Sequence, residues 1–278
     1  MTLLTTNPNR YMKTVFLPLL CLVTLPATLV AQFTTYSQKV QADTFVSSGD
    51  PNSNFGLQGG MEIAAPTDAQ PRTQMTLLRF DTSGLRANFD ADYGVGKWIL
   101  SGVTLSLFSS VPTAGQQPNN GRFNKIAAGS FELDLLGNND WNEMGITWNT
   151  LPGILPGNGN TNTLTPLGTF FWDAAGEPGS IWTLDANSTL AGQIYNGERV
   201  TILGQPTADS TVAYLFNTLN FDPGYLNVTA TAVPEPSAAM LIAAFMCVIG
   251  GRFFIVVRQH VNTEWDQVAR RSGLKGKR

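Results

Sequence analysis

The feature that most constrains the fold is a series of short segments rich in β-branched and aromatic residues, separated by clusters of Gly, Pro, Asn and Asp. Segments of this kind are typical of strands, and the clusters between them are typical of turns and loops. The pattern predicts an all-β domain. The expected strands are residues 33–46, 60–65, 73–80, 97–109, 129–135, 165–171, 181–184, 201–205, 212–216 and 225–231.

One short helix is expected at residues 189–196, with Asn187 or Ser188 as its N-cap. The sequence does not alternate strands with helices, so a nucleotide-binding sheet is not expected. Long polar loops at residues 112–121 and 151–165 are expected on the surface, where binding functions tend to lie.

The first 31 residues have the composition of a secretory signal peptide. Lys13 opens a short basic region, residues 15–25 are apolar, and small residues follow at 27–31. This succession of basic, apolar and small residues is typical of a cleaved export signal. We therefore predict an exported protein with a signal peptide at residues 1–31, and Met12 is an alternative start.

The C-terminal part begins with a linker, because residues 233–237 read Val-Pro-Glu-Pro-Ser. Each proline lacks a backbone N–H and restricts the residue before it, so the linker is expected to be extended and exposed. The apolar run at residues 238–251 is shorter than the roughly 20 residues that span a bilayer comfortably. Residues 253–257 extend it to a transmembrane helix if the long Arg252 side chain reaches the membrane surface.

This order of Pro-Glu-Pro motif, apolar run and arginines at residues 233–258 resembles the PEP-CTERM sorting signal of Gram-negative bacteria. The resemblance implies an inner-membrane-anchored precursor that an exosortase, a membrane protease, cleaves near the motif and passes to the cell envelope or extracellular matrix. It leaves a basic cytoplasmic tail at residues 259–278. An ordinary membrane anchor with positive residues inside is the alternative. The residues that carry the signal are Pro234, Glu235, Pro236, Arg252 and Arg258.

Residues 32–232 are long enough for one β-domain with a sizeable core. This span holds 8 Lys and Arg against 17 Asp and Glu, a net charge of −9. Nucleic acid is not expected as a partner, because phosphate neutralisation by Lys and Arg dominates that kind of binding. The span has no cysteine and no histidine, which excludes Ser-His-Asp and Cys-His catalysis and zinc sites built on those ligands.

Four different motifs follow one another along this span. They are Ala-Asp-Thr-Phe-Val at 42–46 with Asn-Phe-Gly at 54–56, Leu-Leu-Arg-Phe-Asp at 77–81, Trp-Asn-Glu-Met-Gly-Ile-Thr-Trp-Asn-Thr-Leu-Pro at 141–152, and Pro-Gly-Tyr-Leu-Asn-Val at 223–228. Together they resemble the DNRLRE-type domain, a family similar to carbohydrate-binding modules. The resemblance implies a jelly-roll-type β-sandwich of the kind found in secreted bacterial proteins and polysaccharide-degrading enzymes.

The aromatic residues divide between the core and candidate sugar-binding positions. Trp141, Ile146 and Trp148 are expected to pack inward around a bend, because tryptophan buries a large area. An exposed ring can instead stack on a sugar. The better candidates for stacking adjoin loops or element ends, and they are Trp98, Trp172, Trp182 and Tyr195.

Arg79 lies between Leu78 and Phe80 and therefore points to the opposite face of its strand. We expect it to pair with Asp81 or another nearby acid, and contact with an anionic glycan is the functional alternative.

Asp43, Asn54 and Asp81 offer oxygen ligands of the kind that calcium takes. A bound calcium would also offset part of the negative charge of the domain. The same short side chains are equally good turn formers, since they bond to their own backbone. Calcium is the one cofactor that the sequence suggests, and both roles remain open.

The function expected from these observations is an exported, non-enzymatic β-sandwich that binds a polysaccharide or serves as a component of the envelope or matrix. No catalytic residue is assigned. One alternative is a polysaccharide-acting enzyme, which would need two carboxyl groups at a set separation. Another is a purely structural surface protein. The carboxylates available to an enzyme are Asp134, Asp140, Glu143, Asp173 and Glu177.

Overall fold

Two antiparallel sheets and two α-helices form the part of the protein that the structure, a computed structural model, describes: residues 32–109, 115, 121–157, 159–175 and 179–233. The predicted signal peptide, Pro-Glu-Pro motif, transmembrane helix and basic tail lie outside these residues, as does Glu177. Among the described residues, no helix is long and apolar enough to cross a membrane.

The first sheet has four strands, and each pairs antiparallel with its neighbours. Burial alternates along its last strand in sequence, where Leu226, Val228 and Ala230 are buried and the residues between them are half-buried. In spatial order the strands are β1 (Phe33–Lys39), β11 (Tyr225–Ala232), β5 (Trp98–Phe108) and β8 (Gly179–Leu184).

The second sheet has seven strands, again with antiparallel pairing. The main core lies between the two sheets, with Val103 and Leu105 from one and Phe80, Leu133 and Ile202 from the other. The predicted β-sandwich is therefore confirmed, and its jelly-roll order stays a prediction. In spatial order the strands are β10 (Ala213–Asn217), β3 (Gly60–Ala64), β4 (Gln74–Asp81), β9 (Arg199–Pro206), β6 (Gly129–Leu136) and β7 (Leu164–Trp172), and β2 (Ala42–Ser47) pairs with β4.

The segment predicted as a single strand at 33–46 is in fact two strands that belong to different sheets. At the break, the Val40 N–H donates to the carbonyl of Gly224, and the Gln41 N–H donates to the carbonyl of Arg79. Both backbone N–H groups at the crossing between the two sheets are thus paired. The prediction was wrong because the β-branched pattern continues through the bend.

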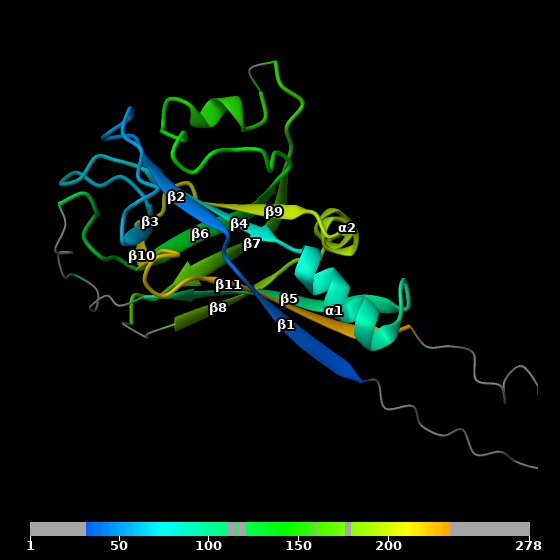
Figure 1. The fold of residues 1–278 in the computed structure, drawn as a ribbon. Coiled ribbons are helices and arrows are strands. Elements are labelled where there is room, and N and C mark those ends of the chain that lie inside the picture. The colour runs from blue at the N-terminus through cyan, green and yellow to red at the C-terminus, as the bar shows by residue number, and fades with distance from the viewer. Residues whose placement is uncertain (1–31, 110–114, 116–120, 158, 176–178, 234–278) are drawn as a thin grey trace, which may run out of the picture. The chain divides into compact units, whose positions relative to one another are not determined.

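A helix that the sequence analysis missed, α1 (Ser83–Tyr93), follows β4 directly. Only Leu85 and Phe89 of this helix are buried, so its apolar signal is weak. The predicted helix is confirmed as α2 (Ser188–Asn196), with Asn187 as its N-cap. The two helices lie side by side at one end of the sandwich (Figure 1).

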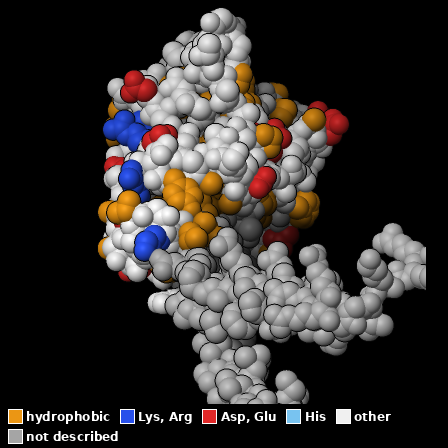
Figure 2. All heavy atoms as spheres, turned by 90° about the vertical axis from the view of Figure 1, so that its right-hand side faces the viewer, with side chains coloured by type: hydrophobic (Ala, Val, Ile, Leu, Met, Phe, Trp, Pro, Cys, Tyr) orange, Lys and Arg blue, Asp and Glu red, His pale blue; other side chains and the backbone are white. Residues whose placement is uncertain are grey.

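Figure 2 shows the end of the molecule that carries these helices. Hydrophobic side chains gather near the middle of this face, Lys and Arg side chains lie along one edge, and Asp and Glu side chains are scattered. No broad basic surface is visible on this face.

The covering segment, residues 137–157 and 159–163, packs on the outer face of the second sheet and is drawn in green at the top of Figure 1. Trp141 and Ile146 are buried there against Leu77 and Leu203, and the Trp141 indole N–H donates to the Thr201 hydroxyl at 3.0 Å. These two residues are core, as predicted. Trp148 is only half-buried, at the edge of the same cluster.

Candidate functional site

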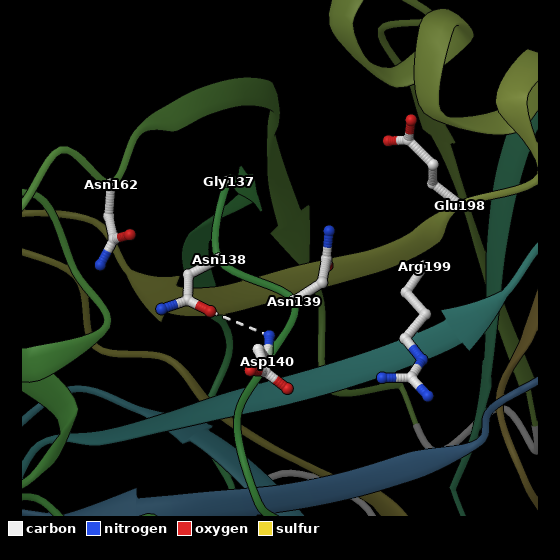
Figure 3. A pocket seen from close by; sticks show the side chains of 7 residues that line it. All are labelled: Gly137, Asn138, Asn139, Asp140, Asn162, Glu198 and Arg199. Carbon is white, nitrogen blue, oxygen red and sulfur yellow. Dashed lines mark hydrogen bonds between the residues drawn. The ribbon is translucent and has the colours of Figure 1, made fainter.

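A polar cleft lies where three strands of the second sheet meet at one edge. Leu136 ends β6 opposite Leu164, which begins β7, and opposite Thr201 near the start of β9. The residues just outside these strand ends therefore gather around one opening of about 680 Å³ (Figure 3). The lining residues are Gly137, Asn138, Asn139, Asp140, Asn162, Glu198 and Arg199.

The first wall of the cleft is shaped by a close approach of two chain segments. The Gly137 N–H donates to the carbonyl of Thr163, and a Cβ at Gly137 would lie only 2.4 Å from the Thr163 hydroxyl oxygen. A larger residue at this position would force Thr163 to shift. The Asn138 side chain then accepts the Asp140 N–H at 2.9 Å (Figure 3), a local turn that fixes the Asp140 backbone.

The second wall comes from the turn between α2 and β9. Gly197 has a φ of 66°, a left-handed conformation that glycine adopts at no steric cost, and it ends the helix. The carbonyl of Glu198 accepts the Thr82 hydroxyl at 2.6 Å, which ties the turn to the start of α1. Figure 3 shows Arg199 and Asp140 on opposite sides of the cleft.

Arg79 bonds to the covering segment beside the cleft. Its guanidinium donates to the carbonyl of Trp141 at 2.6 Å and lies 4.8 Å from the centre of the indole ring. Burial, and next the positive charge of Arg199, lower the Arg79 pKa. The expected pairing with Asp81 is wrong, because Asp81 accepts the Ser83 N–H at the start of α1, and hydrogen bonds from Ser83 lower the Asp81 pKa.

The side chains that line the cleft determine which ligand groups it can bind. Amides and carboxylates accept hydrogen bonds, while amides and the guanidinium donate them, so the lining can pair with a ligand rich in hydroxyl groups. No aromatic side chain is among the lining residues of this cleft. A sugar held here would be recognised through its hydroxyl groups.

Two of the aromatic residues predicted to stack on sugar are part of the core. Trp98 is 1% exposed, donates to the Asp90 carboxylate at 2.8 Å and stacks on Tyr195. Trp172 is 7% exposed and packs against Tyr214. The expectation that these two rings are exposed is wrong, because both close the sandwich core.

Trp182 and Tyr195 are half-buried and also face the core. Trp182 lies edge-on to Phe131 with ring centres 5.0 Å apart, and the Tyr195 hydroxyl donates to the carbonyl of Trp98. Neither residue lines the cleft. Sequence reasoning missed Asn138, Asn162 and Arg199, although a run of polar residues directly after a strand was a usable signal.

Asp43 and Asn54, two of the predicted calcium ligands, are each bonded to Glu143, whereas Asp81 is bonded elsewhere. The Asp43 N–H donates to the Glu143 carboxylate at 3.3 Å. The Asn54 amide donates to the carbonyls of Glu143 and Ile146 at 2.7 and 2.8 Å. We call Asp43, Asn54 and Glu143 the acidic node. Asp81 lies apart from it, at the start of α1.

The carboxylates considered for an enzyme have separate partners. Asp140 lines the cleft, and Glu143 belongs to the acidic node. Asp134 accepts the Gln205 amide at 3.0 Å, and Asp173 accepts the Ala175 N–H in a turn. In the described part of the chain, no group of three or more His, Cys, Asp and Glu side chains is placed to hold a metal ion.

The described domain is thus a β-sandwich with an open polar cleft beside three strand ends. The family model of carbohydrate-binding module family 96 matches residues 34–220, and the chain belongs to this family. The expected likeness to carbohydrate-binding modules is confirmed. No curated protein matches the sequence.

Proposed function

We propose that this chain is an exported, non-enzymatic protein that binds a polysaccharide in the polar cleft. The observation that carries the proposal is the gathering of amide, guanidinium and carboxylate groups at an open sheet edge, in a chain of a carbohydrate-binding family. Such groups satisfy hydroxyls that both donate and accept hydrogen bonds.

The charges of the cleft favour a neutral, hydroxyl-rich glycan. Arg199 contributes one positive charge, and Asp140 and Glu198 contribute two negative charges. Arg79 is engaged with Trp141, so its guanidinium is not directed to a ligand. An anionic glycan would meet more negative than positive charge at this opening, which weakens the earlier alternative for Arg79.

Export and sorting are part of the same proposal. The Pro-Glu-Pro motif begins one residue after Val233, which directly follows the last strand, so a protease acting there would release the sandwich intact. The proposed route is an inner-membrane precursor, cleavage by an exosortase, and delivery to the envelope or extracellular matrix. Intact-mass analysis of the secreted protein should give a chain that ends near Pro236. Full-length chain recovered only from the inner membrane would instead mean a plain membrane anchor.

A glycan array probed with the full-length protein tests the binding function. We expect Arg199→Ala and Asn162→Ala to lower binding of the captured glycan at least roughly tenfold, the effect of losing about one good hydrogen bond to a charged group. Lys39→Ala is the charge-matched control, because Lys39 is exposed on the other sheet. Release of reducing sugar would indicate the enzyme, and an empty array would indicate the structural surface protein.

A further inference from the structure

We propose that the acidic node is a calcium site, in which the carboxylates of Asp43 and Glu143 bind the ion and Asn54 positions Glu143. The proposal is independent of glycan binding in the cleft. It revises the ligand set expected from the sequence, because Glu143 takes the place of Asp81.

Asp43 supplies the main observation. Its side chain is 1% exposed, and one carboxylate oxygen accepts the Leu219 N–H at 2.5 Å. The other oxygen, Oδ1, is buried and has no hydrogen-bond partner. A buried carboxylate oxygen without a partner is costly, because it has lost its water and gained nothing in return. A bound cation supplies what Oδ1 lacks.

Glu143 brings a second negative charge to the same place. Its carboxylate accepts the Asp43 backbone N–H, and the residue is half-buried, whereas Asp43 is buried. Burial is the main cause that raises the Asp43 pKa to about 6, and the charge of Glu143 adds to it against the Leu219 hydrogen bond. Two neighbouring carboxylates, one of them buried, match the charge of a divalent ion.

Asn54 holds this arrangement rigid without being a ligand. Its amide nitrogen is committed to two carbonyls of the covering segment, and its oxygen accepts the Gly56 N–H at 3.1 Å. A Cβ on Gly56 would lie 2.8 Å from the Glu143 Cγ, so the loop packs directly on the glutamate side chain. These contacts hold the Glu143 backbone in place before an ion binds.

The chemistry of the node selects calcium among the common divalent ions. Its charged groups are carboxylates alone, which are hard oxygen ligands, and the described domain residues include no cysteine or histidine for zinc. Calcium accepts irregular sets of six to eight oxygens and completes them with carbonyls and water, whereas magnesium requires near-ideal octahedral geometry. Two protein carboxylates predict weak binding, with a Kd of about 10⁻⁴ to 10⁻³ M, as extracellular calcium modules show.

Calcium titration of chelator-treated full-length protein by calorimetry tests the proposal. We expect one site in the wild type, and a melting temperature that rises with millimolar calcium more than with magnesium. Asp43→Asn and Glu143→Gln keep an oxygen to accept the Leu219 and Asp43 N–H groups but remove the charge, so each should weaken binding roughly tenfold or more. Asp81→Asn is the matched control and should bind calcium like the wild type.

Two results would overturn the proposal. One is a wild type that takes up no calcium and melts identically with and without chelator, which would leave the node as a hydrogen-bonded carboxyl pair. The other is undiminished calcium binding by both Asp43→Asn and Glu143→Gln, provided that circular dichroism shows them folded. Glycan binding by the same samples reports separately on the cleft, so the two proposals can fail independently.

Discussion

The polar cleft and the acidic node both include residues of the covering segment, yet they differ in solvent exposure and in hydrogen bonding. Asp140 faces an open cleft, whereas Glu143, three residues later, closes over a carboxylate that is 1% exposed. Trp141 lies between them and anchors both to the sheet. Within four residues, the same loop thus supplies one carboxylate to an open cleft and another to a hydrogen bond with a buried strand.

The largest expected effect concerns the anchor that the two regions share. Trp141→Ala should lower the free energy of unfolding by about 3–5 kcal/mol, because it deletes a buried aromatic ring, its bond to Thr201 and the support under Arg79. Urea denaturation measures this. Trp148→Ala should cost clearly less, because Trp148 is half-buried. Equal losses in the two variants would show that Trp141 is not the anchor.

The next effect is a pH dependence of the free energy of unfolding, which we expect from Asp43 in the acidic node. The folded-state pKa of Asp43 is about 6, above its ordinary value of 3.8, so the folded protein binds the proton more tightly than the unfolded chain does. Stability from this group is complete below its ordinary pKa and is lost as the pH rises through 6.

In chelator, the wild type should therefore lose roughly 2–3 kcal/mol relative to Asp43→Asn between about pH 4 and pH 7. Denaturation curves of the two proteins across this range make the measurement. Parallel pH profiles for wild type and variant would mean that Asp43 is as well solvated in the folded protein as in the unfolded chain.

A smaller effect is expected at Asn54. Asn54→Ala removes two hydrogen bonds to the covering segment and leaves the carbonyls of Glu143 and Ile146 without this donor, at a cost of about 1–3 kcal/mol. Calcium affinity should fall with stability, while glycan affinity at the cleft should change little. A variant that loses glycan binding but keeps calcium binding would reverse the roles of the two regions.

The smallest effect on stability is expected in the cleft itself. Arg199→Ala should change the free energy of unfolding by no more than about 0.5 kcal/mol, because Arg199 is exposed. Thermal unfolding and glycan binding of the same variant measure its stability and its affinity separately. A large loss of stability would place Arg199 with the anchoring residues.

The sequence predicts the two regions unequally, and the reasons are physical. Strand composition and turn clusters were enough for most of the sandwich, and Asn187 was a sufficient signal for α2. The missed helix α1 buries only Leu85 and Phe89. Trp98 was wrongly expected to be exposed, because its burial against Tyr195 of α2, far along the chain, cannot be seen from its neighbours in sequence.

Two of the three residues of the acidic node were predicted from the sequence, whereas the cleft was not. Asp43 and Asn54 stood out as oxygen ligands, but their meeting with Glu143 depends on how residues about 90 to 100 positions apart fold together. The cleft residues follow strand ends, and only the pairing of β6 with β7 and β9 brings Asn138, Asn162 and Arg199 to one edge.

Hydrogen exchange of the full-length protein, with and without the glycan captured on the array, tests the central claim most directly. If the cleft binds the glycan, the backbone amides at 137–140, 162 and 198–199 should gain protection, and the acidic node should exchange as before. Protection confined to the outer face of β1, β11, β5 and β8, or to the node, with none in the cleft, would contradict the assignment.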